Sequence, residues 1–369
     1  MTGYSINSAL IKVKNNFVFF ADNSTKGVFK MTDLRHPKIY KTPILIKETS
    51  CFGSVLEKEG PLGKYLDGCV SDKLGEGETW EKNESDTVKR TLSRLFEKAE
   101  LKENEVDAIL GGDLMNQCTG CGYGVEKFDI PYLGLYGACS TFVLGMMLGS
   151  CLIESQMCKR NACIASSNFC TAERQYRFPL NYGSFPKETS QHTVTGCGAA
   201  LLEGVEERKK GIYVKSALAG IVIDRGITNA SNMGAAMSTA AADTILRFFK
   251  TTGKSFEDYD VVATGDLGKI GLEMTKEMLS CHGYEDKTGV FTDCGVKIYD
   301  LENQDVSCGG SGCGCSAVTF CGYYYDLLKK GLIKNMLLVG TGAMMSPQSL
   351  LQGLSIPAVA HLVEVEAVV

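Results

Sequence analysis

Cys139 lies in the stretch GACST at 137–141, where a thiol is surrounded by the small residues of a tight turn. The apolar run IPYLGLY before the turn reads as a strand, and the uncharged run TFVLGMMLGSCLI from Thr141 onward is typical of a buried helix. Backbone N–H groups at the start of a helix lower the pKa of a nearby thiol and favour the nucleophilic thiolate. The same spacing also suits a turn chosen for close packing, with Ser140 or Thr141 as helix cap. The turn alone leaves both interpretations open, because a nucleophile also needs a base and a group that orients the base.

The remaining cysteines do not form a recognisable metal-binding pattern. The chain has sixteen cysteines and no N-terminal signal peptide, which favours free thiols over a disulfide framework. Cys118 and Cys121 form one C-x-x-C, and Cys313 and Cys315 form a C-x-C with Cys308 nearby. A second C-x-x-C or a pair of histidines is missing around them, so we expect small-residue packing and no metal site.

An internal repeat shows which elements position the Cys139 turn. Shifted by 153 residues, segment 91–114 aligns with 244–267 without a gap, and seven of the 24 positions are identical. Each copy reads as an amphipathic helix, a strand and a Gly-Asp turn that ends in Asp113 or Asp266. Further on, 138–167 resembles 314–342, which places Cys139-Ser140 on Cys315-Ser316. The unit helix–strand–loop–helix–strand therefore occurs twice.

The duplication predicts an α/β fold of two similar halves about a pseudo-twofold axis. Alternating helices and apolar strands indicate mainly parallel central sheets layered with helices, with ligand sites at strand carboxyl ends where the halves meet. We expect an N-terminal extension over 1–42, a first half over 43–205 and a second half over 206–369. The extension has no counterpart in the repeat.

Charge and hydropathy exclude two other classes of protein. The net charge of -5 gives no electrostatic surface for nucleic acid. Residues 130–153 carry no charge and are long enough to cross a bilayer, but they contain Pro131 and read as a strand followed by a helix. We therefore expect no transmembrane segment.

Ten short motifs follow one another in a specific order over residues 43 to 369. They are EGPLGKYLD (59–67), GDLMNQ (112–117), IPYLGLYGACST (130–141), TAERQYRFP (171–179), TVTGCGAALL (193–202), MGAAMSTAAADTI (233–245), DVVATGDLG (260–268), DCGVKIY (293–299), DVSCGGSGCGCSAV (305–318) and SIPAVAH (355–361). Together they resemble the stage V sporulation protein AD family, a branch of the thiolase-like fold related to the ketoacyl synthase III condensing enzymes. The first 42 residues lie outside this resemblance.

The resemblance implies a non-catalytic protein that binds dipicolinic acid as part of the spore machinery for uptake of calcium dipicolinate. In condensing enzymes of this fold, the turn cysteine works with a histidine and an asparagine, or a second histidine, of the second half. By the repeat, these would stand at 264–267 and 309–312, and neither place holds either residue. Cys139 is then a vestigial nucleophile. Two alternatives remain: an acyltransferase or condensing enzyme that uses Cys139, and a purely structural scaffold of a membrane complex.

Dipicolinate is a flat pyridine with two carboxylates, so its site needs cations or N–H donors beside a thin apolar slot. Arg174 and Arg177 follow a predicted strand and form the best cationic pair, unless Arg174 is held in an ion pair with Glu173. Tyr176 and Phe178 are candidates for walls of the slot.

Asp293 and Cys294 belong to a second candidate, in which the carboxylate binds the ligand through calcium or a protonated carboxyl. The alternative is a turn in which Asp293 caps backbone N–H groups. The remaining candidate ligand-binding residues are Cys139, Asp266, Gly310 and Ser311.

The resemblance also implies partners and a location. We expect dipicolinate, alone or with calcium, as ligand and no further cofactor. A homodimer is expected, together with other membrane proteins of the same uptake complex and a peripheral position on the spore inner membrane after synthesis in the cytoplasm.

Overall fold

The computed structural model describes residues 33–70, 79–177 and 186–369. The chain divides into the units 1–33 and 34–369, and the helices and strands below belong to the second unit. Phe178 and most of the predicted extension lie outside the described residues.

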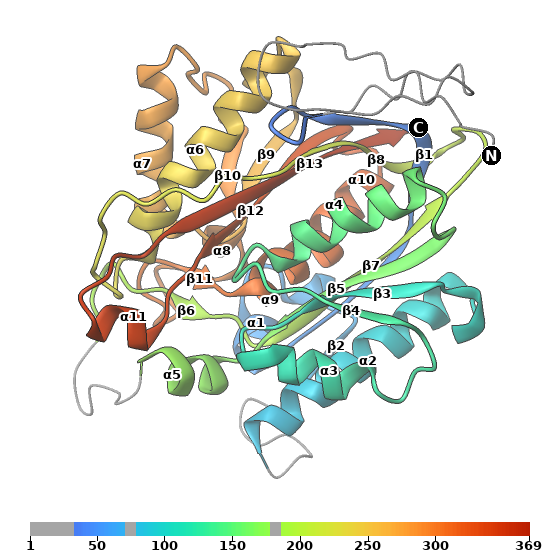
Figure 1. Cartoon of the computed structure of the whole chain (residues 1–369), viewed down its shortest axis with the longest axis horizontal. Coiled ribbons are helices and arrows are strands. Elements are labelled where there is room, and N and C mark those ends of the chain that lie inside the picture. Colours follow the sequence, from blue (N-terminus) through green and yellow to red (C-terminus); the bar gives the residue numbers. More distant parts are fainter. Residues whose placement is uncertain (1–32, 71–78, 178–185) are drawn as a thin grey trace, which may run out of the picture. The chain divides into compact units, whose positions relative to one another are not determined.

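The strands of the described chain repeat in the same order in each half (Figure 1). In the first half the order is β1 (Lys38–Gly53), β7 (Gly196–Gly204), β5 (Arg160–Ser167), β3 (Ala108–Gly112) and β4 (Tyr132–Gly134). In the second half it is β8 (Gly211–Leu218), β13 (Ala358–Val368), β12 (Asn335–Ala343), β9 (Val261–Thr264) and β10 (Phe291–Asp293). Antiparallel pairing of β1 with β8 joins the two half-sheets.

The direction of pairing is the same in both halves. β3 pairs in parallel with β4 and β5, and β9 pairs in parallel with β10 and β12. β7 and β13 run antiparallel to their neighbours. Gly112 at the end of β3 and Thr264 at the end of β9 therefore mark equivalent carboxyl edges, each followed by a turn that carries an aspartate.

Helices form the layers around these half-sheets (Figure 1). The middle layer contains α4 (Thr141–Glu154) and the continuous helix formed by α9 (Cys313–Val318), η5 (Thr319–Tyr324) and α10 (Tyr325–Lys329). The outer helices are α2 (Trp80–Ala99) and α3 (Thr119–Val125) on the first half, and α6 (Met233–Thr252) and α7 (Gly268–Cys281) on the second. α4 contacts strands of both halves, which explains why its sequence carries no charge before its last turn.

Shorter elements complete the edge of the sheets around the Cys139 turn. They are α5 (Phe169–Arg177), β6 (His192–Thr193), α8 (Cys294–Ile298), β11 (Gly310–Ser311) and α11 (Pro347–Leu351). β11 and β6 pair in parallel as a separate two-stranded sheet. The first half also has α1 (Val55–Glu59), η1 (Gly63–Tyr65), β2 (Gly68–Cys69), η2 (Glu103–Glu105) and η3 (Asn116–Cys118), and the second has η4 (Phe256–Asp258).

The predicted boundaries can be placed on these elements. β1 begins at Lys38, within the predicted extension 1–42, and position 206 lies in the loop between β7 and β8. The uncharged stretch 130–153 contains β4, the Cys139 turn and most of α4. Over the described residues, every helix is too short or too polar to span a bilayer.

Candidate functional site

The turn between β4 and α4 fixes Cys139 where the two halves meet. Ala138 has a φ of 50°, a left-handed conformation that is uncommon for a residue with a side chain and that clusters at functional sites. Ser140 Oγ donates to the Gly137 carbonyl at 2.6 Å, and Thr141 Oγ1 donates to the Ala138 carbonyl at 2.7 Å. A Cβ at Gly342 on β12 would lie 2.5 Å from the Gly137 carbonyl oxygen, so β12 of the second half approaches the turn closely.

Cys139 lines a narrow pocket of about 420 Å³, a volume that includes the open mouth. The space inside it that is free for a molecule is about 40 Å³, so the lining side chains nearly close the pocket. Both halves supply its walls, which consist mainly of apolar and aromatic side chains: Leu114, Tyr136, Ala138, Ala172, Tyr176, Met233, Ala343 and Met345. Thr193, Ser311 and Glu173 add polar groups. Within the described part of the chain, no lysine or arginine lines this pocket.

Asp266 lies beside the thiol, in the turn between β9 and α7. Its carboxylate accepts a hydrogen bond from Thr341 Oγ1 at 2.6 Å and from the Gly312 N–H at 3.1 Å. Burial raises the pKa of Asp266 to about 8, since the hydrogen bonds that favour the charged form only partly offset desolvation. The carboxyl group is therefore largely protonated at neutral pH.

The environment of Cys139 makes its thiol a poor nucleophile. Burial raises its pKa well above the usual value, and the charge and hydrogen bond of Asp266 raise it further. Of the two interpretations that the sequence left open, the raised pKa favours a turn chosen for packing over an activated thiol, because desolvation and a neighbouring acid outweigh the start of α4.

Asp293 and Cys294 lie behind this site, outside the pocket lining. Asp293 caps α8 by accepting from the Val296 N–H at 3.2 Å, and it also accepts from the N–H groups of Leu267 and Gly268 at 2.8 and 3.1 Å. Burial raises its pKa to about 6. Asp293 thus holds the turn that carries Asp266, which agrees with the capping alternative. Cys294 is fully buried in the core.

β11 connects the predicted residues Gly310 and Ser311 to the pocket. Ser311 lines the pocket and pairs with Thr193 of β6, while Gly310 pairs with His192. The following Gly312 has a φ of 97° and begins α9 as its N-cap. The expected second Cys-Ser turn is therefore wrong: Cys315 and Ser316 lie inside α9, and the turn before this helix is formed by Ser311 and Gly312.

The predicted arginine pair does not line the described pocket. Arg174 forms an ion pair with Glu81 and lies over the Trp80 ring at 5.4 Å, so its side chain is directed toward α2. Glu173, the ion-pair partner that the sequence suggested, lines the pocket. Arg177 ends α5, and its side chain lies outside the described residues.

Two tyrosines form a wall that the sequence indicates only in part. Tyr176 donates its hydroxyl proton to the Leu114 carbonyl, which leaves the Tyr136 hydroxyl to donate to Tyr176. Both rings line the pocket. Tyr176 was a candidate wall residue from its place in TAERQYRFP, whereas nothing in the sequence joined it to Tyr136.

No histidine of the described chain lines the pocket. His192 stacks on Phe169 with ring centroids 4.2 Å apart. His361 accepts a hydrogen bond from the Gly220 N–H at 3.1 Å, and burial lowers its pKa to about 4. His282 lies at the C-terminal end of α7, and His36 is exposed. Over the same residues, no group of three or more His, Cys, Asp and Glu side chains could hold a metal ion.

Comparisons with known proteins identify the family. The family model for stage V sporulation protein AD matches residues 35–366. Stage V sporulation protein AD of Bacillus subtilis (strain 168) is 36% identical over 323 residues, which cover 88% of this chain and 94% of that protein.

Solved structures of Xanthomonas campestris OleA share the thiolase-like fold. The cerulenin-bound co-crystal structure superposes with a TM-score of 0.58 at 11% identity, covering 91% of this chain and 99% of OleA. The acetamide-bound structure gives a TM-score of 0.58 at 11% identity, covering 89% and 100%. Because the family model matches nearly the whole described part of the chain, the chain belongs to the stage V sporulation protein AD family of sporulation proteins.

Proposed function

We propose that the chain is a non-catalytic binding protein for dipicolinate, acting in the uptake of calcium dipicolinate by the developing spore. The observation that carries the proposal is the pairing of Cys139 with an acid, Asp266, beside the pocket that Cys139 lines. A condensing enzyme needs a thiolate, and burial together with this neighbour opposes thiolate formation.

The pocket lining suits a flat aromatic ring. Tyr136 and Tyr176 supply a wall with fixed hydroxyl groups, while Met233 and Met345 supply flexible apolar surface. Thr193 and Ser311 bring hydroxyl donors to the pocket, which also opens on the Cys139 turn. A planar ligand of the size of dipicolinate enters this narrow slot when the lining side chains move apart, a movement that flexible methionines such as Met233 and Met345 allow.

The charge of the lining favours the calcium chelate over the free dianion. Glu173 is 8% exposed and is the charged residue among the described lining side chains, so this part of the lining offers no cation to a bare dicarboxylate. In the one-to-one calcium chelate the two carboxylates are neutralised, and Glu173 offers the kind of oxygen ligand that calcium prefers. Calcium would thus arrive with its ligand.

A calorimetric titration tests this function. Dipicolinate is titrated into the purified protein with and without equimolar calcium, and we expect tighter binding with calcium. Glu173→Gln should weaken binding of the chelate at least about tenfold, the loss of one charge-assisted contact of about 1.5–3 kcal/mol. Glu188→Gln, an exposed neighbour outside the lining, serves as the charge-matched control. Absence of binding under both conditions would refute the ligand assignment.

The alternative of an acyltransferase rests on the retained turn and thiol. That enzyme would leave an acyl group on Cys139 after incubation with acyl-coenzyme A, detectable by mass spectrometry of the intact protein. The scaffold alternative predicts that pocket variants such as Glu173→Gln are silent in dipicolinate binding.

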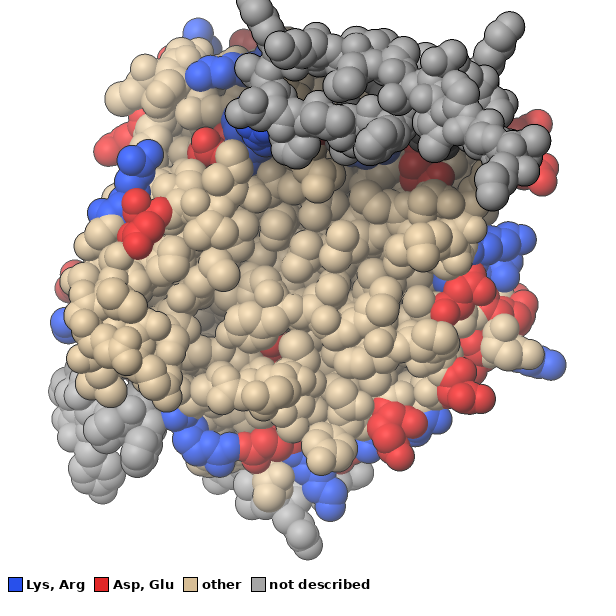
Figure 2. Space-filling view, viewed as in Figure 1, with Lys and Arg blue, Asp and Glu red and all other residues tan. Residues whose placement is uncertain are grey.

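Further proposals concern assembly and location. β4 is an edge strand of the described sheet; Leu133 within it is 45% exposed, and Tyr136 just after it is 48% exposed. Figure 2 shows that the face of the molecule carrying α4 and β4 has few charged side chains except at its margin. An uncharged face next to an open sheet edge supports a homodimer that pairs across β4. Membrane partners of the uptake complex would then hold the dimer at the spore inner membrane.

A further inference from the structure

A second groove lies away from the Cys139 pocket, between the first half and helix α10. It encloses about 990 Å³, open space included. Its lining contains four lysines and three acids: Lys64, Lys98, Lys329, Lys330, Glu48, Asp67 and Asp326. Tyr65 and Tyr325 add aromatic surface, and Thr49, Leu66, Cys321 and Gly322 complete the lining.

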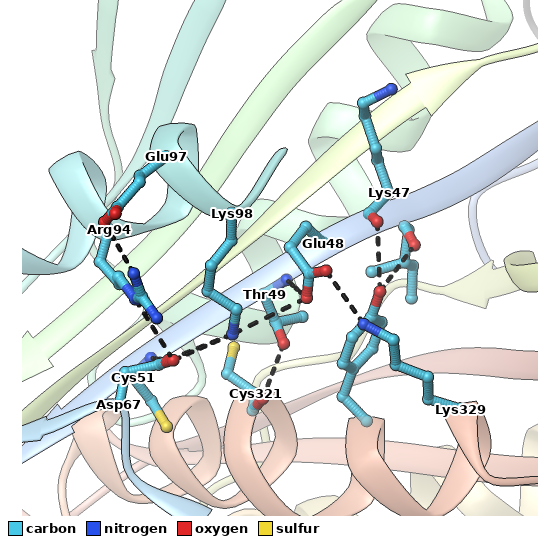
Figure 3. A network of polar contacts seen from close by, with 12 residues as sticks. Lys47, Glu48, Thr49, Cys51, Asp67, Arg94, Glu97, Lys98, Cys321 and Lys329 are labelled. Atoms are coloured by element: carbon cyan, nitrogen blue, oxygen red, sulfur yellow. Dashed lines mark hydrogen bonds and ion pairs between the residues drawn. The ribbon is translucent and has the colours of Figure 1, made fainter. Parts of the chain in front are cut away.

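The two least exposed acids of the groove are each held by two cations (Figure 3). Asp67 pairs with Lys98 at 3.1 Å and with Arg94 at 3.7 Å. Glu48 pairs with Lys329 at 3.1 Å and with Lys98 at 3.8 Å. The side chains of these acids are 14% and 12% exposed, so their charges are already neutralised within the protein. Because the groove lining has four lysines and three acids, it carries a net positive charge.

Lys64 and Lys330 line the same groove as Tyr65 and take no part in the described ion pairs of these two acids. Lys64 is exposed and lies over the Tyr65 ring at 5.1 Å, without an ion pair to a described acid. Lys330, the C-cap of α10, is 59% exposed and pairs with Asp326 of that helix at 2.7 Å. The hydrogen bond to Asp326 raises its pKa, and Lys330 lines the same groove as Tyr65. An exposed pair within one helix is weak and readily exchanged for a stronger anion.

The helix beside the groove is irregular at this point. η5 is one turn of π-helix, and it carries Cys321 and Gly322 to the groove. A Cβ at Gly322 would lie 3.0 Å from both Cys51 Sγ and the Tyr65 carbonyl oxygen, so the widened turn packs directly against β1 and η1. Single π-helical turns inside α-helices frequently accompany functional sites.

We propose that this groove binds a phosphate ester, with the phosphate between Lys64 and Lys330 and its organic part over Tyr65. Lysine ammonium groups bind phosphate as point charges, whereas flat carboxylates favour the paired donors of arginine. Arg94, the arginine nearest these lysines in the network, is occupied by Asp67 and Glu97. The phosphate can belong to a lipid headgroup or to a free phosphate ester. The groove is independent of the dipicolinate pocket.

The test compares two probes on the full-length protein. Glycerol 3-phosphate is titrated calorimetrically, and vesicles of phosphatidylcholine with and without phosphatidylglycerol are used in co-sedimentation. The groove variant is Lys64→Gln with Lys330→Gln, and the matched control is Lys82→Gln with Lys287→Gln, two exposed lysines outside the groove. Both double variants remove the same net charge.

We expect the groove variant to weaken binding at least about tenfold, while the control stays within about twofold. Dipicolinate binding should be unchanged in both, which separates this proposal from that of the Cys139 pocket. A loss seen with glycerol 3-phosphate assigns a free ester, and a loss seen only with phosphatidylglycerol vesicles assigns a lipid headgroup. Equal losses in both double variants, or no binding of either probe, would overturn the proposal.

Discussion

Replacing the acid beside Cys139 should partly restore the reactivity of its thiol. In Asp266→Asn the carboxylate charge is removed while the side-chain shape is kept. The pKa of Asp266 is about 8 and that of Cys139 lies well above 9, so in the native protein the thiolate forms beside a carboxylate that is already ionised. The substitution removes this repulsion but leaves the burial of the thiol unchanged.

The size of the effect follows from electrostatics. Two unit charges about 4 Å apart repel by about 4 kcal/mol at an effective dielectric constant of about 20, an upper value equal to about 3 pKa units. A lower pKa gives more thiolate but also a weaker nucleophile, with a Brønsted coefficient of about 0.5. The logarithm of the alkylation rate therefore rises by about half of the pKa shift. We therefore expect alkylation of Cys139 by iodoacetamide to rise by about 10- to 30-fold at about pH 10, where the Asp266 carboxyl group is ionised, and by only about twofold at about pH 8, where half of it is protonated.

The assay is mass spectrometry of the Cys139 peptide over time, with the exposed Cys281 of the same sample as internal reference. Asp113→Asn is the matched control, since Asp113 occupies the equivalent turn and accepts from the Met115 and Cys121 N–H groups at 2.8 and 2.7 Å. The Asn variant leaves the Gly312 N–H facing a donor, which costs about 1–3 kcal/mol of stability. Thermal unfolding confirms that the variant is folded. An unchanged ratio of Cys139 to Cys281 alkylation in folded Asp266→Asn would refute the role assigned to the acid.

Three further predictions concern stability and assembly. Burial raises the pKa of Glu84 to about 8 and that of Asp113 to about 6, above their unfolded values, so their contribution to stability is complete below about pH 4. This stabilisation is lost as the pH rises through the pKa values of the folded state, so the melting temperature should fall between pH 5 and pH 8.5. Glu84→Gln should make this fall smaller. An identical pH dependence in the variant and the native protein would contradict the assignment. Gly198→Ala should destabilise the fold by more than about 2 kcal/mol in denaturant unfolding, because its Cβ would lie 2.4 Å from the Ala317 carbonyl carbon. Gly122→Ala, with nothing within 4 Å of its Cβ in α3, should instead stabilise the fold by about 0.5–1 kcal/mol, and equal effects would contradict the packing argument. Leu133→Asp should convert a dimer to a monomer in light scattering, while Leu332→Asp, exposed in the loop between α10 and β12, should not; a dimer in both variants would exclude pairing across β4.

The fold could be predicted because the chain repeats itself. The match of 91–114 with 244–267 corresponds to α2 and β3 on one side and to α6 and β9 on the other. The second alignment failed locally, since α9 begins at Cys313 and so places Cys315 inside a helix. A repeated order of elements does not fix the residue at which a helix starts, because the N-cap at Gly312 depends on a φ of 97° that composition alone does not specify.

The candidate site could be predicted only where the turn itself supplies the residue. Cys139 and Ser311 line the pocket and Asp266 lies directly beside the thiol, because backbone turns at the sheet edge position all three. Arg174 has a long side chain whose direction depends on partners in α2, Glu81 and Trp80, which are far away in the sequence.

Contacts between distant segments account for the other differences. The Tyr136–Tyr176 contact joins residues forty positions apart. The charged network of the second groove connects α2, β1 and α10, and only the packed structure shows which lysines remain without a neutralising acid.

The central claim is that the cleft holds a ligand without forming a covalent bond. A crystal structure of the protein with calcium dipicolinate tests it most directly. We expect the pyridine ring between the tyrosine wall and Met233 and Met345, with calcium beside Glu173 and no bond to Cys139. A ligand bound elsewhere with this pocket empty, or an adduct on the Cys139 sulfur, would contradict the account.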